Sequence, residues 1–477
     1  MREPFEIRLS RRDFFYLGLM LPGLGLAAQS AQPVSPASRY LEYDDVDAII
    51  RSGAFPLPSG LAALRGAAVR AAWPQWVRGR DSAIRSRIQK GEEDTLANFV
   101  LFGVSFTNQR RVTPDLTDPN EIDRVIRDRV RSFVDAVARP GTNERLVVLG
   151  GLIARLGHSA SAGEPRELLS EYVMENVRRY LAERQQYEST VARSLGNDTT
   201  SSFSTTAELY KDRGLSVDTD FRPNYAIETA LAEVKRRGLL RSVRRAAVVG
   251  PGLDFTDKDS GFDHYPLQTL QPFAVVDSLL RLGLARLPDL RVSLFEISVP
   301  TLDHITRAVV RARAGQAYTL QMVLDRSRQW DRKALDYWQR FGLTIGSAVQ
   351  PLPLPAQVRN ADRRALRIRP EIVALMEPQP INVVLQRMVL RPEQQYDLII
   401  GTNVLIYYDG FEQSLALSNI DAMTAAGGVF LTNDISREYP GTRLRPSGIV
   451  RVDYSPKQAD QVQIYSRSTF QLQLPPV

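Results

Sequence analysis

The sequence predicts an α/β protein in which a helical region is followed by a doubly wound, mostly parallel sheet. Residues 245–249, 291–295 and 398–400 are runs of strand length that are apolar at most positions, which is typical of strands buried on both faces of a sheet. The stretches 267–284 and 412–425 have the apolar spacing of amphipathic helices. A strand, a helix and a second strand form one right-handed crossover unit, and the repetition of this unit predicts the fold class.

The composition is that of an ordinary globular protein and excludes several classes of function. The 477 residues can bury more than one core, and 43% of them are hydrophobic and 24% charged. The net charge of +7 is spread along the chain without a Lys/Arg run, so we expect no nucleic-acid partner. The absence of cysteine excludes disulfides, a thiolate nucleophile and Cys-bound zinc.

We expect no metal site. The three histidines, His158, His264 and His304, are too scattered in the sequence to indicate zinc. Residues 257–263 have the spacing Asp257-x-Asp259-x-Gly261-x-Asp263, which hints at a calcium loop. The glycine of that loop is misplaced, however, and no acidic residue closes it, so a solvated loop is favoured.

The N-terminus has the features of an export signal of the twin-arginine type. The paired Arg11 and Arg12 precede a short apolar run, residues 16–28, that ends in small residues. This run is too short and too rich in proline and glycine for a stable membrane span. We therefore expect residues 1–31 to be a signal read by the Tat export machinery, which would place the protein in the periplasm or outside the cell. The alternative is that this segment is the N-terminal helix of a cytoplasmic protein and is not read as a signal.

Composition and periodicity suggest where the domains begin and end. We expect a helical domain at residues 32–222, which covers or supports an α/β domain at residues 223–477. A proline-rich insertion at about 320–367 is expected to be a surface excursion, and alternating residues at about 447–466 predict a closing antiparallel hairpin. The five other strands of the sheet are expected near Ala246, Val292, Val383, Leu398 and Phe430.

Glycines and polar side chains follow the predicted strands, at the edge where open α/β sheets bind ligands. The first strand runs into Gly250-Pro251-Gly252, a turn that lets a ligand approach the backbone closely. Alone this is a weak signal. The second strand ends in Glu296, where a carboxylate can accept hydrogen bonds from a ribose diol. Asn403 follows the fourth strand, and the combination favours a nucleotide-like cofactor.

Four motifs resemble those of the chemoreceptor methyltransferases, the CheR family. Residues 295–298 (FEIS), 312–318 (ARAGQAY) and 403–409 (NVLIYYD) are similar to its Asp-Ile-Ser, Ala-x-x-Gly-x-Tyr and Arg-Asn-Val-Leu-Ile-Tyr-Phe motifs. Residues 271–274 (QPFA) resemble its Glu-Pro-Tyr-Ser segment. The resemblance covers about residues 245–435.

This resemblance implies a class I methyltransferase that depends on S-adenosylmethionine (SAM) and has a Rossmann-like sheet of seven strands. It implies methyl transfer to an unknown protein or small-molecule acceptor, with a carboxylate as the acceptor group in the resembled family. Asn403 and Tyr407 are the implied catalytic positions. The cofactor-binding positions, from the resemblance and the strand ends together, are Gly250, Gly252, Gln271, Glu296, Gln386, Thr402 and Asn403.

The chain departs from the family at several of these positions. Gln271 replaces the glutamate of the family and Thr402 replaces its arginine, whereas Glu296 conservatively replaces an aspartate. In methyltransferases generally the first strand ends in an acidic residue and a third glycine follows, but here these positions are Val248 and Asp254.

Export and SAM chemistry conflict, because SAM is a cytoplasmic metabolite. Three interpretations stay open: an active methyltransferase that works before export or is not cleaved, an exported binding module that has lost catalysis on this scaffold, and an interaction protein built around the helical region. A shared fold does not decide between them.

Changing both Arg11 and Arg12 to Lys should abolish the export of a reporter fused after Gln32. The physical reason is that the paired arginines before an apolar run are what the twin-arginine machinery reads. Export can be measured as periplasmic reporter activity, with the native leader as the control. Unchanged export of the double variant, or no export with the native leader, would contradict this expectation.

Overall fold

The computed structural model describes residues 36–113, 116–158, 166–194, 214–215, 221–256, 262–356, 358, 360–435, 437–456 and 458–468, with side chains only to residue 186 in the third range. The expected export signal, residues 1–31, lies outside these residues. Ala37–Val477 form one compact unit, so the division into a helical and an α/β domain stays a prediction. Among the described residues, no helix has the length and apolar character needed to cross a membrane.

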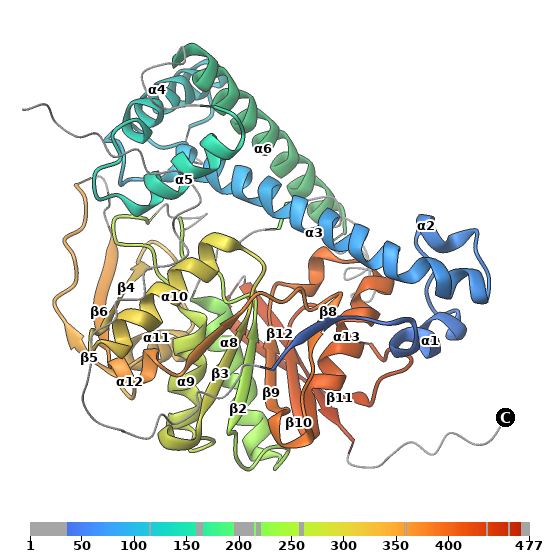
Figure 1. Ribbon diagram of the computed structural model, residues 1–477. Helices are drawn as coiled ribbons and strands as arrows, with labels where there is room; N and C mark the ends of the chain where they lie inside the picture. The colour runs from blue at the N-terminus through green and yellow to red at the C-terminus, as the bar shows by residue number, and fades with distance from the viewer. Residues whose placement is uncertain are drawn as a thin grey trace, which may run out of the picture. The chain divides into compact units, whose positions relative to one another are not determined.

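A sheet of seven strands lies at the centre of a mixed α/β fold (Figure 1). Its spatial order is β11-β12-β10-β9-β2-β3-β7, and β12 runs antiparallel to both of its neighbours while the other pairs are parallel. The order reverses at β2, because β3 and β7 lie on one side of it and β9 and β10 on the other. The strands are β2 (Arg245–Val249), β3 (Arg291–Phe295), β7 (Met376–Gln379), β9 (Tyr396–Gly401), β10 (Thr424–Thr432), β11 (Leu444–Ser455) and β12 (Gln458–Arg467).

Helices cover both faces of this sheet. The helices of the first part of the chain are α1 (Tyr43–Ser52), α2 (Ser59–Ala62), α3 (Ala67–Phe102), α4 (Pro119–Val137), α5 (Glu144–Arg155) and α6 (Arg166–Ser194). Those of the second part are α8 (Arg222–Arg236), α9 (Gln271–Arg281), α10 (Val299–Arg313), α11 (Arg332–Arg340), α12 (Pro370–Val373) and α13 (Gly410–Met423).

The central strand β2 is buried on both faces. Ala246 and Val248 pack with α8, α9 and α10 in one core, whereas Ala247 and Val249 pack with α13 and with α1 to α3 in a second core. Both sets of side chains are therefore removed from water, which explains why the sequence of this strand is apolar without alternation. The first three helices thus belong to the packing of the sheet itself.

The long helix α3 connects two cores. Its first half, from Val69 to Ile88, packs in the second core, and its end, from Leu96 to Leu101, packs with α4, α5 and α6 in a third core. Gly91 lies between these halves, where the backbone of Leu215 approaches so closely that an added Cβ would lie 1.9 Å from the Leu215 carbonyl oxygen. A larger residue at this position would displace one of the two segments.

Buried polar bonds tie α3 and α5 to the loop after β2. Arg145 of α5 is 2% exposed and donates to the carbonyl oxygen of Asp254 at 3.1 Å, and also to those of Phe255 and Tyr265. Asp263 accepts the N–H of Val104, just after α3, at 2.8 Å. The region of the suspected calcium loop is therefore engaged in structure at Asp263, while residues 257–261 lie outside the described part.

The structure corrects two expectations about strands. The third strand of the sheet is β7, not a strand near Val383; Val383 lies in a turn before the short strand β8 (Gln386–Met388), which pairs with β1 (Ser38–Tyr40). The insertion is not a surface excursion. It forms a three-stranded antiparallel sheet of β4 (Tyr318–Asp325), β6 (Ala361–Ile368) and β5 (Gly346–Val349) that packs in the first core together with α11.

Candidate functional site

The pairing register brings the predicted site positions side by side at the carboxyl edge of the sheet. Val249 of β2 pairs with Phe295 of β3 and with Gly401 of β9. The next residues along these three strands are Gly250, Glu296 and Thr402. These residues lie at the place in the sheet where the strand order reverses, which is where open α/β sheets bind ligands.

The turn after β2 has the backbone that a close ligand contact requires. Gly250 and Gly252 have φ values of 64° and 62°, a region that residues with a Cβ rarely adopt. A Cβ added to Gly250 would also lie 2.8 Å from a methyl group of Val404, so the loop after β9 packs directly against this turn. The N–H of Gly250 donates to the carbonyl oxygen of Phe295 at 2.9 Å, which fixes the turn to β3.

Glu296 is buried beside this turn, with 7% of its surface exposed. Its Oε1 accepts the N–H groups of Ile297 at 2.7 Å and Ser298 at 2.8 Å. Burial raises the pKa of the Glu296 carboxyl, and the backbone N–H groups of Ser298, Ile297 and Gly252 partly offset that rise by stabilising the charged form. A carboxylate has about four lone-pair positions, so about one stays available for a ligand hydroxyl.

The two positions at which the chain departs most from the resembled family touch each other. Gln271 is the first residue of α9, and its Nε2 donates to Thr402 Oγ1 at 2.8 Å. Both residues are buried, with exposed fractions of 3% and 5%. This neutral hydrogen bond crosses the switch point between β2 and β9 and places two polar groups next to the glycine turn.

Asn403 and Tyr407 lie on the short segment after β9. Asn403 is exposed and has a φ of 57°, a left-handed value that asparagine adopts more readily than most residues. The Asn403 N–H donates to Asn433 Oδ1 at 2.9 Å, and Asn433 Nδ2 donates to Asn403 Oδ1 at 3.0 Å. The carbonyl oxygen of Tyr407 accepts a hydrogen bond of 2.9 Å from Arg87 of α3, so α3 contacts the segment directly.

The sequence analysis missed Asp434, which holds this segment in place. Asp434 Oδ2 accepts the N–H groups of Val404 at 2.8 Å and Leu405 at 2.7 Å. Burial raises the pKa of the Asp434 carboxyl to about 7. Asp434 comes two residues after the end of β10, and applying the same strand-end argument to β10 as to β9 would have found it.

Gln386 is the one predicted site residue that the structure does not bring to this group. It lies in β8 opposite Tyr40 of β1, and its Oε1 accepts the N–H of Asn382 at 3.0 Å. None of the described contacts joins it to the glycine turn. Its role in cofactor binding stays a prediction. Among the described residues, no cluster of three or more acidic or histidine side chains is arranged to hold a metal ion.

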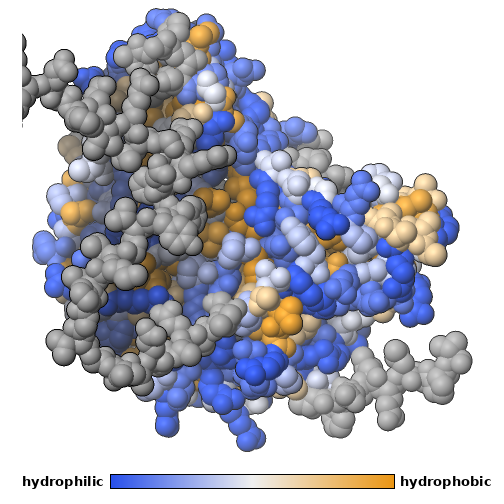
Figure 2. Space-filling view, viewed as in Figure 1, coloured by the Kyte–Doolittle hydropathy of each residue, from blue (hydrophilic) through white to orange (hydrophobic). Residues whose placement is uncertain are grey.

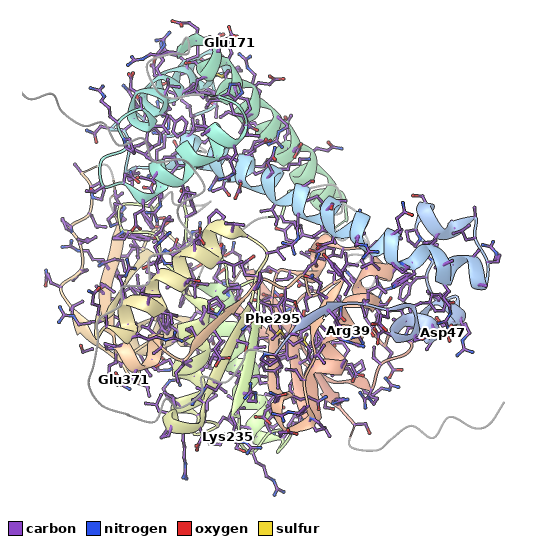
Figure 3. All side chains as sticks on the ribbon, in the orientation of Figure 1. Arg39, Asp47, Glu171, Lys235, Phe295 and Glu371 are labelled. Atoms are coloured by element: carbon purple, nitrogen blue, oxygen red, sulfur yellow. The ribbon has the colours of Figure 1, made fainter. Side chains whose placement is uncertain are left out.

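Apolar side chains surround the polar positions of the site. Ile297, Val404 and Tyr407 are partly buried and pack against the second core. Figure 2 shows orange, apolar side chains gathered between α3 and α10 on this face of the molecule. In Figure 3, Phe295 marks the carboxyl end of β3 in the middle of the molecule, below α3. The site is therefore an apolar region with a small number of placed polar groups, as ligand sites commonly are.

Comparison with known proteins gives structural similarities at low sequence identity. No protein family and no curated protein matches the sequence. Among solved structures, the N-methyltransferase NodS from Bradyrhizobium japonicum WM9 is 9% identical, with 52% of this chain and 96% of that chain covered and a TM-score of 0.25. The mitomycin 7-O-methyltransferase MmcR is 12% identical, with 84% and 100% covered and a TM-score of 0.28. The glycopeptide N-methyltransferase MtfA, solved with SAM, is 10% identical, with 51% and 77% covered and a TM-score of 0.22.

Replacing Asp434 by Asn should flatten part of the dependence of stability on pH. The folded pKa of this carboxyl is raised from 3.8 to about 7, so the native state keeps a proton that the unfolded chain has lost. The stability from this group is fully present below pH 3.8 and is lost as the pH rises through about 7. Between these values the wild type should lose up to about 1.4 kcal/mol per pH unit relative to Asp434→Asn.

Urea denaturation at a series of pH values measures this difference. The Asn variant keeps an acceptor oxygen for the N–H groups of Val404 and Leu405. It therefore retains these hydrogen bonds while removing the group that gains and loses a proton. Asp453→Asn is a matched control, because the Asp453 side chain is 56% exposed. Asp453→Asn should follow the pH profile of the wild type. If Asp434→Asn follows that profile as well, the raised pKa assigned to Asp434 is wrong.

Proposed function

We propose that the chain binds SAM at the carboxyl ends of β2, β3 and β9 and transfers its methyl group to an acceptor. The observation that carries this proposal is the reversal of strand order at β2, which places the left-handed turn of Gly250 and Gly252 next to the buried Glu296. This is the arrangement by which doubly wound folds hold the phosphate or methionine part of a cofactor on one strand and its ribose on the next. The four motifs that resemble the CheR family support SAM as that cofactor.

The contact between Gln271 and Thr402 supports a maintained site over a degenerate one. In the resembled family these positions are a glutamate and an arginine, and in this chain they are joined by a hydrogen bond of 2.8 Å. The two departures are thus one coupled change from charged to neutral groups. A buried polar group left without a partner costs about 1–3 kcal/mol, and this pair avoids that cost.

Each group of the site has a distinct role under this proposal. The backbone of Gly250 and Gly252 approaches the cofactor closely, Glu296 accepts a ribose hydroxyl, and Gln271 with Thr402 borders the methionine end. The segment of Asn403 and Tyr407 borders the acceptor side, next to α3 and to apolar side chains. SAM supplies an electrophilic methyl group, and its transfer needs positioning and the exclusion of water more than acid–base help.

The nature of the acceptor belongs to the proposal and follows from the resemblance. A carboxylate acceptor, as in the CheR family, is ionised at neutral pH and would need no base in the site. The twin-arginine signal adds the proposal that the protein is exported, so that it either works before export or keeps its cofactor bound. A turnover assay with cytoplasmic and periplasmic extracts separates a catalyst from an exported binding module, because only a catalyst transfers labelled methyl groups.

Glu296→Gln should weaken SAM binding by about tenfold while keeping the fold. The amide oxygen can still accept the N–H groups of Ile297 and Ser298, but a charge-assisted bond to a ribose hydroxyl, worth roughly 1.5–3 kcal/mol, becomes a neutral one. Glu296→Ala should weaken binding further and also lower the melting temperature, since it leaves buried N–H groups unpaired. Isothermal titration and thermal melts measure the two effects separately.

A matched control for this test is Glu371→Gln. The Glu371 side chain at the start of α12 is 59% exposed and far from the strand ends in Figure 3, so SAM affinity and melting should stay as in the wild type. Wild-type affinity in Glu296→Gln would show that the ribose has another partner. A collapsed melt of Glu296→Gln would make Glu296 a structural residue.

A further inference from the structure

The amino edge of the sheet, opposite the candidate site, carries a concentration of positive charge. In Figure 3, Lys235 lies at this edge, at the bottom of the view, and Phe295 lies at the other end of the strands. Two segments supply the charge, residues 235–245 and 282–291, and Asp289 is their only acidic residue. We call their exposed cations the basic edge, namely Lys235, Arg236, Arg237, Arg241, Arg244, Arg286 and Arg291.

Backbone hydrogen bonds hold the two segments of the basic edge side by side. The N–H of Val243 donates to the carbonyl oxygen of Leu284 at 2.6 Å. The N–H of Arg291 donates to the carbonyl oxygen of Arg244 at 2.8 Å. The sequence shows no long uninterrupted run of Lys and Arg in either segment, so only the fold reveals that these cations share one surface.

The carboxylates near the basic edge leave most of its charge unbalanced. Glu233 forms an ion pair with Arg236 at 2.5 Å. Asp397 Oδ2 accepts the backbone N–H groups of Arg244 at 2.7 Å and Arg245 at 3.0 Å. Among the described residues, no ion pair involves the other cations of the basic edge. Figure 2 accordingly shows mostly hydrophilic side chains along the bottom of the molecule.

Helix stability explains only part of the basic edge. Cations in the last turn of a helix stabilise its carboxyl end, which accounts for Lys235 and Arg236 of α8. Arg241 lies beyond that helix and gains nothing from it. Arg245 pairs with Arg291 in the register of β2 and β3, and like charges on neighbouring strands repel each other. The fold therefore gathers like charges at a cost to its own stability, which an anionic partner would offset.

Aliphatic side chains lie among these cations. Leu239, Leu282 and Leu287 are partly exposed. Ile449 of β11 lines a surface pocket together with Arg236 and is 54% exposed. Neither segment contains an aromatic residue or histidine, which disfavours single-stranded nucleic acid, because its bases stack on aromatic rings. A mixture of cationic and aliphatic side chains suits the surface of an anionic bilayer, where cations meet headgroups and apolar groups reach the acyl boundary.

We propose that the basic edge is a peripheral membrane-binding surface that recognises bilayers containing anionic phospholipid. Each cation held near such a surface adds to the attraction, so several together give reversible binding. The proposal does not depend on SAM binding. A protein bound in this way would keep the carboxyl edge of its sheet, with the candidate site, on the side away from the lipid.

Co-sedimentation of the full-length protein with vesicles tests the proposal. The vesicles contain phosphatidylcholine alone or phosphatidylcholine with phosphatidylglycerol, and the measured quantity is the ratio of the anionic to the neutral partition coefficient. We expect a ratio of at least about ten at about 0.1 M salt and a much smaller one at about 1 M, because the Debye length shrinks from about 10 Å to about 3 Å. Equal partition of the wild type into both vesicles overturns the proposal.

Charge reversal tests whether the basic edge is the surface that binds. The triple variant Arg241→Glu, Arg244→Glu and Arg286→Glu should lower the ratio about tenfold, because each change replaces attraction by repulsion. The milder pair Arg241→Gln and Arg286→Gln should lower it about threefold and serves if the triple variant does not fold. A wild-type ratio in the folded variant shows that another surface binds and overturns the proposal.

A matched control separates the basic edge from the net charge of the protein. Arg124→Glu, Arg131→Glu and Arg139→Glu change exposed residues in and just after α4 and alter the net charge equally, so the ratio should stay as in the wild type. An equal loss in this control overturns the assignment to the basic edge. Labelled duplex DNA and single-stranded RNA are further probes. If the wild type binds either one but not the anionic vesicles, and the triple variant loses that binding, the partner is a nucleic acid and the lipid proposal is wrong.

Discussion

The burial of β2 between parallel strands on both sides is the constraint on which the rest of this structure depends. Because β3 and β9 both run parallel to it, their carboxyl ends meet at one edge, and the chain must leave β2 there by a turn with left-handed backbone at Gly250 and Gly252. Helices on both faces leave that edge as the place where polar groups can face a ligand. The position of Glu296 and Thr402 follows from the pairing register alone.

Hydrogen bonds as well as apolar contacts hold other parts of the chain against this edge of the sheet. Arg87 of α3 donates to the Tyr407 carbonyl oxygen after β9, and Arg145 of α5 donates to the Asp254 carbonyl oxygen after β2, so each of these two helices holds one segment of the edge. Asp434 fixes the segment after β9 by accepting the N–H groups of Val404 and Leu405. These bonds would supply the rigidity that the proposed methyl transfer requires, because such a reaction depends on positioning.

The sequence could predict features that a short stretch of residues determines, but not contacts between residues far apart in the chain. The strands β2 and β3 were predicted at their observed residues, because burial on both faces leaves a short apolar run of strand length. Residues 381–385 gave the same signal for another reason: they form a turn in which Asn382 Oδ1 accepts the N–H of Val384, and their apolar side chains pack in the second core. The hydrogen bond between Gln271 and Thr402 joins residues 131 positions apart. No local pattern in the sequence could reveal that these two departures from the resembled family contact each other.

The measurement that tests the central claim most directly is a calorimetric titration of the full-length protein and of Gly252→Val with SAM. The account predicts saturable binding of one SAM per chain to the wild type, and an affinity at least about tenfold lower for the variant. A β-branched residue is strained at a φ of 62° and would enter the space that the ligand needs. No binding to the wild type, or equal affinity for both proteins, would show that the edge formed by β2, β3 and β9 is not a SAM site.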